Sequence, residues 1–164
     1  MPAAAGPAWL VWLETTRLAE LLRREPWLFP LVEVLHILGF VVLVGAAVMF
    51  DLRLLGLSRR LPVTELARHL LPWARGSLAV VVPTGVLLLL PQATQLGMSS
   101  VFRLKLALLA LAGLNATLFH YGVFRSVQAW DTGAPPPPRA RASAIASLVL
   151  WAGVITCGRL LAYL

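Results

Sequence analysis

The chain has 164 residues, of which 59% are hydrophobic and 13% charged, and its mean hydropathy is +0.82. This composition is too apolar for an ordinary soluble domain and predicts an integral membrane protein. At about 20 apolar residues per crossing, the chain can hold four transmembrane helices but no additional soluble catalytic domain. A large extramembrane enzyme is therefore excluded.

The net charge of +7 comes from 14 Lys and Arg residues against 7 Asp and Glu residues, and Lys105 is the only lysine. In so apolar a chain, a basic excess is typical of cytoplasmic loops and anionic-lipid contact rather than of nucleic-acid binding. The single cysteine, Cys157, excludes an internal disulfide, a CxxCH haem attachment and cysteine-cluster metal sites. The first residues lack a basic segment, so no cleaved signal peptide is predicted.

The first predicted element is an amphipathic helix over residues 8–24, within an N-terminal segment of residues 1–27. Its apolar side chains fall on one helical face, which predicts that it lies in the membrane interface. The opposite face carries the charged side chains Glu14, Arg17, Glu20, Arg23 and Arg24.

Four apolar crossings follow, at about residues 28–50, 70–90, 102–124 and 142–163, within a transmembrane domain of residues 28–164. Pro72 and Pro83 predict a kink in the second crossing. Residues 132–141 contain consecutive prolines and predict an extended linker. The predicted fold class is all-α: a four-transmembrane-helix bundle, cytochrome-b-like, with an N-terminal interfacial helix.

The loops differ in charge between the two membrane faces. We name the face that holds the amino terminus side A and the opposite face side B. The bias of basic residues predicts that side B is cytoplasmic and that both termini are periplasmic. Side A carries Arg103 and Lys105 near the third crossing, whereas side B carries Arg53, Arg59, Arg60, Arg68, Arg125, Arg139 and Arg141.

Polar side chains at membrane depth are the candidate functional residues, because they are costly there and persist mainly when paired or functional. Glu33 and His36 are three residues apart and therefore share a face of the first crossing. The complete set of candidate cofactor-binding residues is Glu33, His36, His69, Asn115, His120 and Arg159.

Histidines that project into a helical bundle are typical axial ligands of haem b, and His36, His69 and His120 are therefore candidate metal ligands. His36 and His120 differ in predicted depth by about 15 Å, at 1.5 Å per residue. His69 and His120 fall at nearly equal depth on side B. Three arrangements follow: one haem between His36 and His120, one between His69 and His120, or two cofactors. Alternatively, each histidine hydrogen-bonds a neighbouring helix.

The remaining charged residues also permit specific expectations. Glu33 and Arg159 fall at similar depth near side A, so they are expected to pair, or Arg159 is expected to hold a haem propionate or another anion. The competing interpretation is that Arg159 extends to the interface. Asp51 and Arg53 are expected to make a helix-end and headgroup contact at side B.

Several segments, including residues 35–39, 51–56, 102–105, 115–120 and 158–163, resemble a small bacterial membrane-protein family of unknown function. A looser similarity, carried by a histidine early in the first crossing followed by small residues, extends to the CopD copper-resistance proteins and the HemJ-type haem-binding oxidases. This resemblance implies a cytochrome-b-like bundle and favours His36 and His120 as ligands. The chain is shorter than CopD and lacks a HemJ-like basic motif.

These observations predict a b-type haem protein for electron transfer in the bacterial inner membrane, with quinone or another redox protein as partner and a homo-oligomer as one possible assembly. One alternative is a copper or small-solute transport protein in which Glu33, His36 and Arg159 line a polar pathway. A second is a cofactor-free subunit or scaffold. The residues supply no complete set for a stand-alone enzyme.

Overall fold

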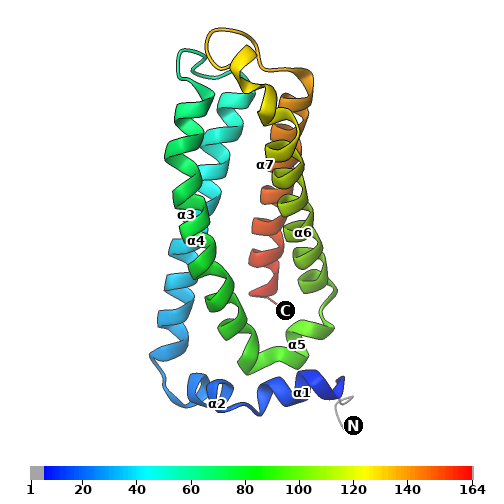
Figure 1. Ribbon diagram of the computed structural model, residues 1–164. Helices are drawn as coiled ribbons and strands as arrows, with labels where there is room; N and C mark the ends of the chain where they lie inside the picture. The colour runs from blue at the N-terminus through cyan, green and yellow to red at the C-terminus, as the bar shows by residue number, and fades with distance from the viewer. Residues whose placement is uncertain (1–5, 164) are drawn as a thin grey trace.

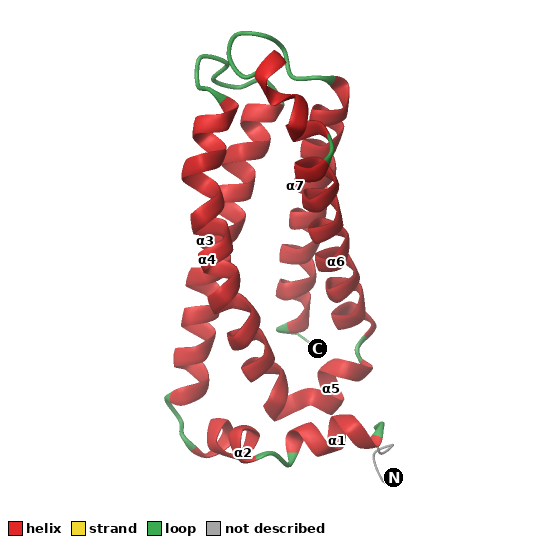
Figure 2. Ribbon diagram, in the orientation of Figure 1, coloured by secondary structure: helices red, strands yellow, loops and turns green. Residues whose placement is uncertain are grey.

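The computed structural model describes residues 6–163, and this part of the chain is entirely helical, as expected (Figures 1 and 2). Long antiparallel helices form a bundle, and short helices lie across its side A end. In chain order the elements are α1 (Ala8–Glu14), α2 (Arg17–Arg24), α3 (Leu28–Leu54), α4 (Val63–Leu89), the 3₁₀ turn η1 (Leu90–Gln92), α5 (Ala93–Met98), α6 (Ser100–Tyr121), η2 (Val123–Ala129) and α7 (Pro138–Leu161).

Four of the helical segments are long and apolar enough to cross a membrane, which confirms the predicted number of crossings. These segments are Leu28–Leu54, Val63–Met98, Ser100–Tyr121 and Pro138–Leu161. The second and fourth begin several residues earlier than the sequence pattern predicted. The fourth begins at Pro138. Proline suits the first position of a helix because the N–H group that it lacks would have no hydrogen-bond partner within the helix there. Pro72 and Pro83 lie inside α4, which stays helical through both.

The predicted single helix over residues 8–24 is instead two helices, α1 and α2. The break falls at two threonines, where the Thr16 side chain accepts a hydrogen bond from the backbone N–H of Ala19 at 3.3 Å and caps α2. The two helices and α5 form a platform across side A (Figure 1). Glu14 Oε1 accepts from the Thr94 N–H at 2.6 Å, and Arg23 donates to the Pro91 carbonyl at 3.1 Å. Hydrogen bonds therefore fasten the N-terminal segment to the second crossing.

The transmembrane helices pack as two hairpins. α3 packs along α4, α6 packs along α7, and the hairpins meet chiefly where α3 contacts α7. The best-packed apolar core lies toward side B, and large apolar side chains elsewhere, such as Val41 and Leu118, are exposed as a lipid-facing surface requires. The core comprises Phe50, Leu54, Val63, Ala67, Phe119, Val127, Trp130, Ala140 and Ala144.

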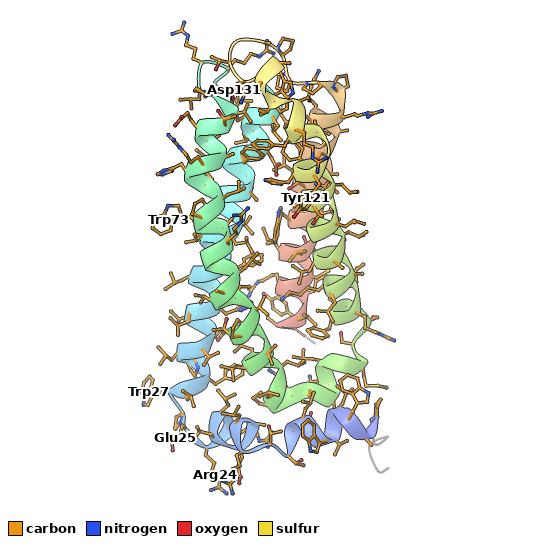
Figure 3. All side chains as sticks on the ribbon, viewed as in Figure 1. Arg24, Glu25, Trp27, Trp73, Tyr121 and Asp131 are labelled. Carbon is orange, nitrogen blue, oxygen red and sulfur yellow. The ribbon has the colours of Figure 1, made fainter. Side chains whose placement is uncertain are left out.

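A buried arginine organises the loops at side B. Arg53 is only 2% exposed and donates hydrogen bonds to the carbonyl oxygens of Leu61 at 2.7 Å, Arg59 at 3.3 Å and Asp131 at 2.9 Å. The expected headgroup contact of Arg53 is therefore wrong, because its guanidinium is enclosed by loop backbone. The Asp131 carboxylate, at the top of the bundle in Figure 3, accepts from the N–H and the hydroxyl of Thr64 at 2.8 and 2.9 Å and caps α4.

Candidate functional site: a polar centre near side A

His36 lies on α3 with its ring directed toward α4. Its Nδ1 is 3.1 Å from the Val81 carbonyl oxygen and 3.0 Å from Thr84 Oγ1. The Thr84 hydroxyl donates to the Val80 carbonyl at 2.6 Å, so its oxygen acts as an acceptor toward His36. Because the Val81 carbonyl can only accept, Nδ1 carries a proton in this arrangement, and Nε2 has no hydrogen-bond partner within residues 6–163.

A glycine makes room for the His36 ring. A β-carbon built on Gly85 would lie 3.1 Å from His36 Cε1, so any larger residue there would press on the imidazole. The ring is half-buried, and it contacts α4 at the Val81 carbonyl, the Thr84 hydroxyl and Gly85. The structure therefore confines His36 to the α3–α4 interface.

Lys105 lies on α6 and approaches α7. Its ammonium nitrogen is 3.7 Å from the position of a β-carbon on Gly158. Within residues 6–163, the ion pairs are the exposed Arg24–Glu20 and Arg68–Glu65 contacts. Lys105 thus brings a positive charge to the interhelical space without a carboxylate neutralising it.

These side chains occupy similar depths. His36 is eight residues from the first residue of α3, which corresponds to about 12 Å at 1.5 Å per residue. Thr84, Lys105 and Cys157 are four or five residues from the side A ends of α4, α6 and α7, or about 6 to 8 Å. We call His36, Thr84 and Lys105, with Cys157 and Gly158 beside them, the polar centre.

Glu33 and Arg159 do not form the expected ion pair. Arg159 is exposed and donates to the Tyr163 hydroxyl at 2.6 Å, and its guanidinium carbon lies 4.8 Å from the centre of the Tyr163 ring. A tyrosine one helical turn away supplies both contacts, so the guanidinium is held at the end of α7. Glu33 is also exposed.

His120 lies far from the polar centre, within an aromatic cluster near side B. Its ring is stacked on Phe50 at 6.4 Å and contacts Phe119 and Phe124 at 5.4 and 5.6 Å between ring centres. Nδ1 is 2.8 Å from the Ala116 carbonyl oxygen, and Nε2 is enclosed without a hydrogen-bond partner in the part of the chain that the structure describes. The neighbouring Tyr121 points outward (Figure 3).

Asn115 and His69 have different surroundings. Asn115 joins α6 to α7: its side-chain nitrogen donates to the Ser143 carbonyl at 3.0 Å, and its oxygen accepts from the Ser143 hydroxyl at 3.1 Å. His69 is exposed and lines a shallow depression with Leu61 and Glu65. Neither residue contributes to the polar centre.

The histidine positions do not fit a haem held between two of them. His36 and Phe50 are 14 residues apart on α3, or about 21 Å along the helix, and His120 stacks on Phe50. Two axial ligands must face one iron, so His36 and His120 are too widely separated. His69 lies two residues, or about 200° of helical rotation, from the buried Ala67, so it faces away from the core that contains Phe119. The structure therefore does not bring either pair of histidines together around one site.

Lys105 and Asp51 are the residues of interest that sequence reasoning did not select. The sequence analysis counted Lys105 among the basic residues near side A, but α6 begins at Ser100 and places it more than one turn inside the helix. A headgroup contact is expected for Asp51 from the sequence, yet this residue is 6% exposed, with the Ser147 hydroxyl of α7 near its carboxyl group. Their rarity within apolar helices is the signal that identifies such residues.

The fold and the polar centre define a small helical membrane protein with ionisable groups among its apolar helices. The chain belongs to a family of unknown function, DUF6644, which matches residues 10–164. No curated protein and no solved structure gave a match. The comparisons therefore establish the family and do not show the looser similarity to CopD and HemJ proteins.

Proposed function

We propose that the protein is a membrane carrier for a small anion, which binds at the polar centre. The observation that supports this proposal is the position of Lys105, whose ammonium lies against α7 without a carboxylate partner among residues 6–163. An isolated charge in a membrane bundle is costly, and an anionic ligand would offset that cost.

The packing of the helices supports reversible access to this centre. The two helices of each hairpin pack against each other along much of their length. In contrast, α4 and α6, which belong to different hairpins, make little contact with each other. A change in the separation of the hairpins would alter access to Lys105 without breaking either hairpin. Rocking of one rigid bundle against another is the usual physical basis of alternating access.

The first experiment measures anion binding by the detergent-purified protein. Sodium acetate, phosphate and chloride are compared with sodium gluconate at equal ionic strength, and the unfolding temperature is recorded. A ligand that binds only the folded protein stabilises it, by about 2.7 kcal/mol at 100 times its Kd. We expect at least one of the three small anions to raise the unfolding temperature of the wild-type protein above its value in gluconate.

The matched variants are Lys105→Met and Arg103→Met. Each removes one positive charge from α6, but Arg103 is exposed whereas Lys105 reaches α7. We expect the anion-dependent shift to be lost in Lys105→Met and kept in Arg103→Met. The proposal fails if no small anion stabilises the wild-type protein, or if the two variants respond alike. Uptake of the binding anion into proteoliposomes then tests transport itself.

A second candidate is a b-type haem protein with His36 as the single protein ligand. The observation that favours it is the Nδ1 contact with the Val81 carbonyl, which fixes the ring and leaves Nε2 available, as second-shell bonds do for ligating histidines. The haem would supply one-electron chemistry, with quinone or a redox protein as its partner. The absorption spectrum of the purified protein tests this: a Soret band that is lost in His36→Ala supports it, and a wild-type protein without one excludes it.

We also propose that the protein resides in the bacterial inner membrane with both termini in the periplasm. Both ends of the described chain lie at side A (Figure 1), and the arginine-rich loops lie at side B. The excess of basic residues in cytoplasmic loops supports this orientation. Labelling of cysteines introduced at exposed Ser58 on side B and Ser100 near side A, with a membrane-impermeant maleimide on intact cells, tests it. The proposal requires the position 100 cysteine alone to be labelled.

A further inference from the structure

Asp51 is the one buried acidic side chain among residues 6–163. It lies near the side B end of α3 and is 6% exposed. The Ser147 hydroxyl on α7 lies near its carboxyl group, and Oδ2 is fully enclosed and has no hydrogen-bond partner in this described range. At least one oxygen atom of the carboxyl group is therefore buried without a donor.

The charged groups of the surrounding elements do not neutralise this carboxyl group. On α3 itself, the Arg53 guanidinium donates to three loop carbonyl groups, and it forms no ion pair with Asp51. On α6, His120 is directed to the Ala116 carbonyl and the aromatic cluster. The contact from α7 is the uncharged Ser147.

The α4 helix, which packs along α3, also supplies no counter-charge at this level. Its ionisable side chains toward side B are Glu65, Arg68 and His69, and all three are exposed. Arg68 is already paired with Glu65 at 2.6 Å. Asp51 therefore faces an apolar interface together with a single hydroxyl donor.

We propose that Asp51 is a proton-binding site, occupied at neutral pH, at the interface of α3 and α7. An ionised carboxylate without a cation is far more costly in such surroundings than the neutral acid. The proton resides on the carboxyl group and passes to a water molecule or hydroxide ion that reaches Oδ2, leaving a carboxylate beside the Ser147 hydroxyl. This site is independent of the proposed anion site, which lies near the opposite end of the bundle.

Infrared spectroscopy of the full-length protein in lipid vesicles tests the proposal directly. A protonated carboxyl group gives a carbonyl band that is resolved from the amide bands and shifts in D₂O. We expect this band in the wild-type protein at pH 7, its loss as the pH is raised, and its absence in Asp51→Asn. Glu33→Gln is the matched control, because it removes an exposed acid from the same helix and is expected to keep the Asp51 band.

A second variant separates a proton site from structural disturbance. Ser147→Ala removes the donor to the carboxyl oxygen, and we expect the carbonyl band to move to higher frequency without disappearing. Lys105→Met is expected to leave the band unchanged, so the proton and anion proposals can fail separately.

Three results would overturn the proposal. The first is a wild-type protein that lacks the band at pH 7, which would mean that Asp51 is ionised. The second is a band that persists in Asp51→Asn. The third is loss of the band on adding sodium chloride at constant pH but not on adding choline chloride, which would assign the site to a metal cation instead of a proton.

Discussion

The two ends of the bundle solve the problem of polar side chains in a membrane differently. At side B, Arg53 is deeply buried, but three carbonyl groups accept its hydrogen bonds and Asp131 caps the adjacent helix. Near side A, Lys105 enters the interhelical space without an acidic partner in the described part of the chain. A buried charge held by several backbone carbonyl groups is typical of a structural role, whereas a charge without an acidic partner is a candidate for ligand binding.

The largest expected effect tests the architectural role of side B. Arg53→Met removes the donor to three loop carbonyl oxygens and is expected to lower the free energy of unfolding by about 3 kcal/mol. Arg59→Met is the control, because Arg59 is exposed and its side chain donates only to the Gly56 carbonyl. Denaturant titration in detergent gives both values. If Arg53→Met and Arg59→Met lowered the free energy of unfolding equally, Arg53 would have no special structural role at side B.

At the polar centre, removal of the charge is expected to raise the stability of the protein instead of lowering it. Lys105→Met replaces a charge that lacks an acidic partner with an apolar chain of similar length, and we expect it to stabilise the protein without added anion by about 1 to 2 kcal/mol. Arg103→Met, at an exposed position, should change stability by less than about 0.5 kcal/mol. Destabilisation by Lys105→Met in anion-free buffer would show that the lysine serves packing.

A smaller loss of stability is expected at the start of α4, which is capped by Asp131 from the loop before α7. Asp131→Ala removes the acceptor for the N–H and hydroxyl of Thr64 and is expected to cost about 1 kcal/mol, the usual loss for a helix N-cap. Because Arg53 binds the backbone carbonyl of residue 131, that contact survives the substitution. Thermal unfolding of Asp131→Ala and of Asp131→Asn provides the comparison, with Asn expected to retain most of the stability.

The smallest effect is expected for the hydrogen bonds between α6 and α7. Asn115→Ala removes the contact with Ser143, and such bonds in membrane bundles contribute about 0.6 kcal/mol on average. Thr117→Ala is a suitable control, since Thr117 is exposed and bonds only its own helix. A loss of several kcal/mol at Asn115 would place it among the architectural residues together with Arg53.

Some site residues could be predicted from sequence because polar side chains in apolar helices are rare. His36 was selected on that ground, and the structure places it against Val81 and Thr84 in the interhelical interface. Its partners could not be predicted, since they depend on which face of α4 meets α3. Likewise, the pairing of Glu33 with Arg159 rested on equal depth, but depth does not specify rotation about a helix axis.

The sequence by itself determined the four crossings, their order and the position of the arginine-rich loops, because hydropathy and charge act locally and a bilayer fixes helix length. Only the tertiary structure decided which polar side chains are enclosed, that His120 stacks on Phe50, and that Lys105 approaches Gly158. The physical reason is that lipid and protein interiors are both apolar, so hydropathy cannot distinguish a lipid-facing side of a helix from one that packs against its neighbour.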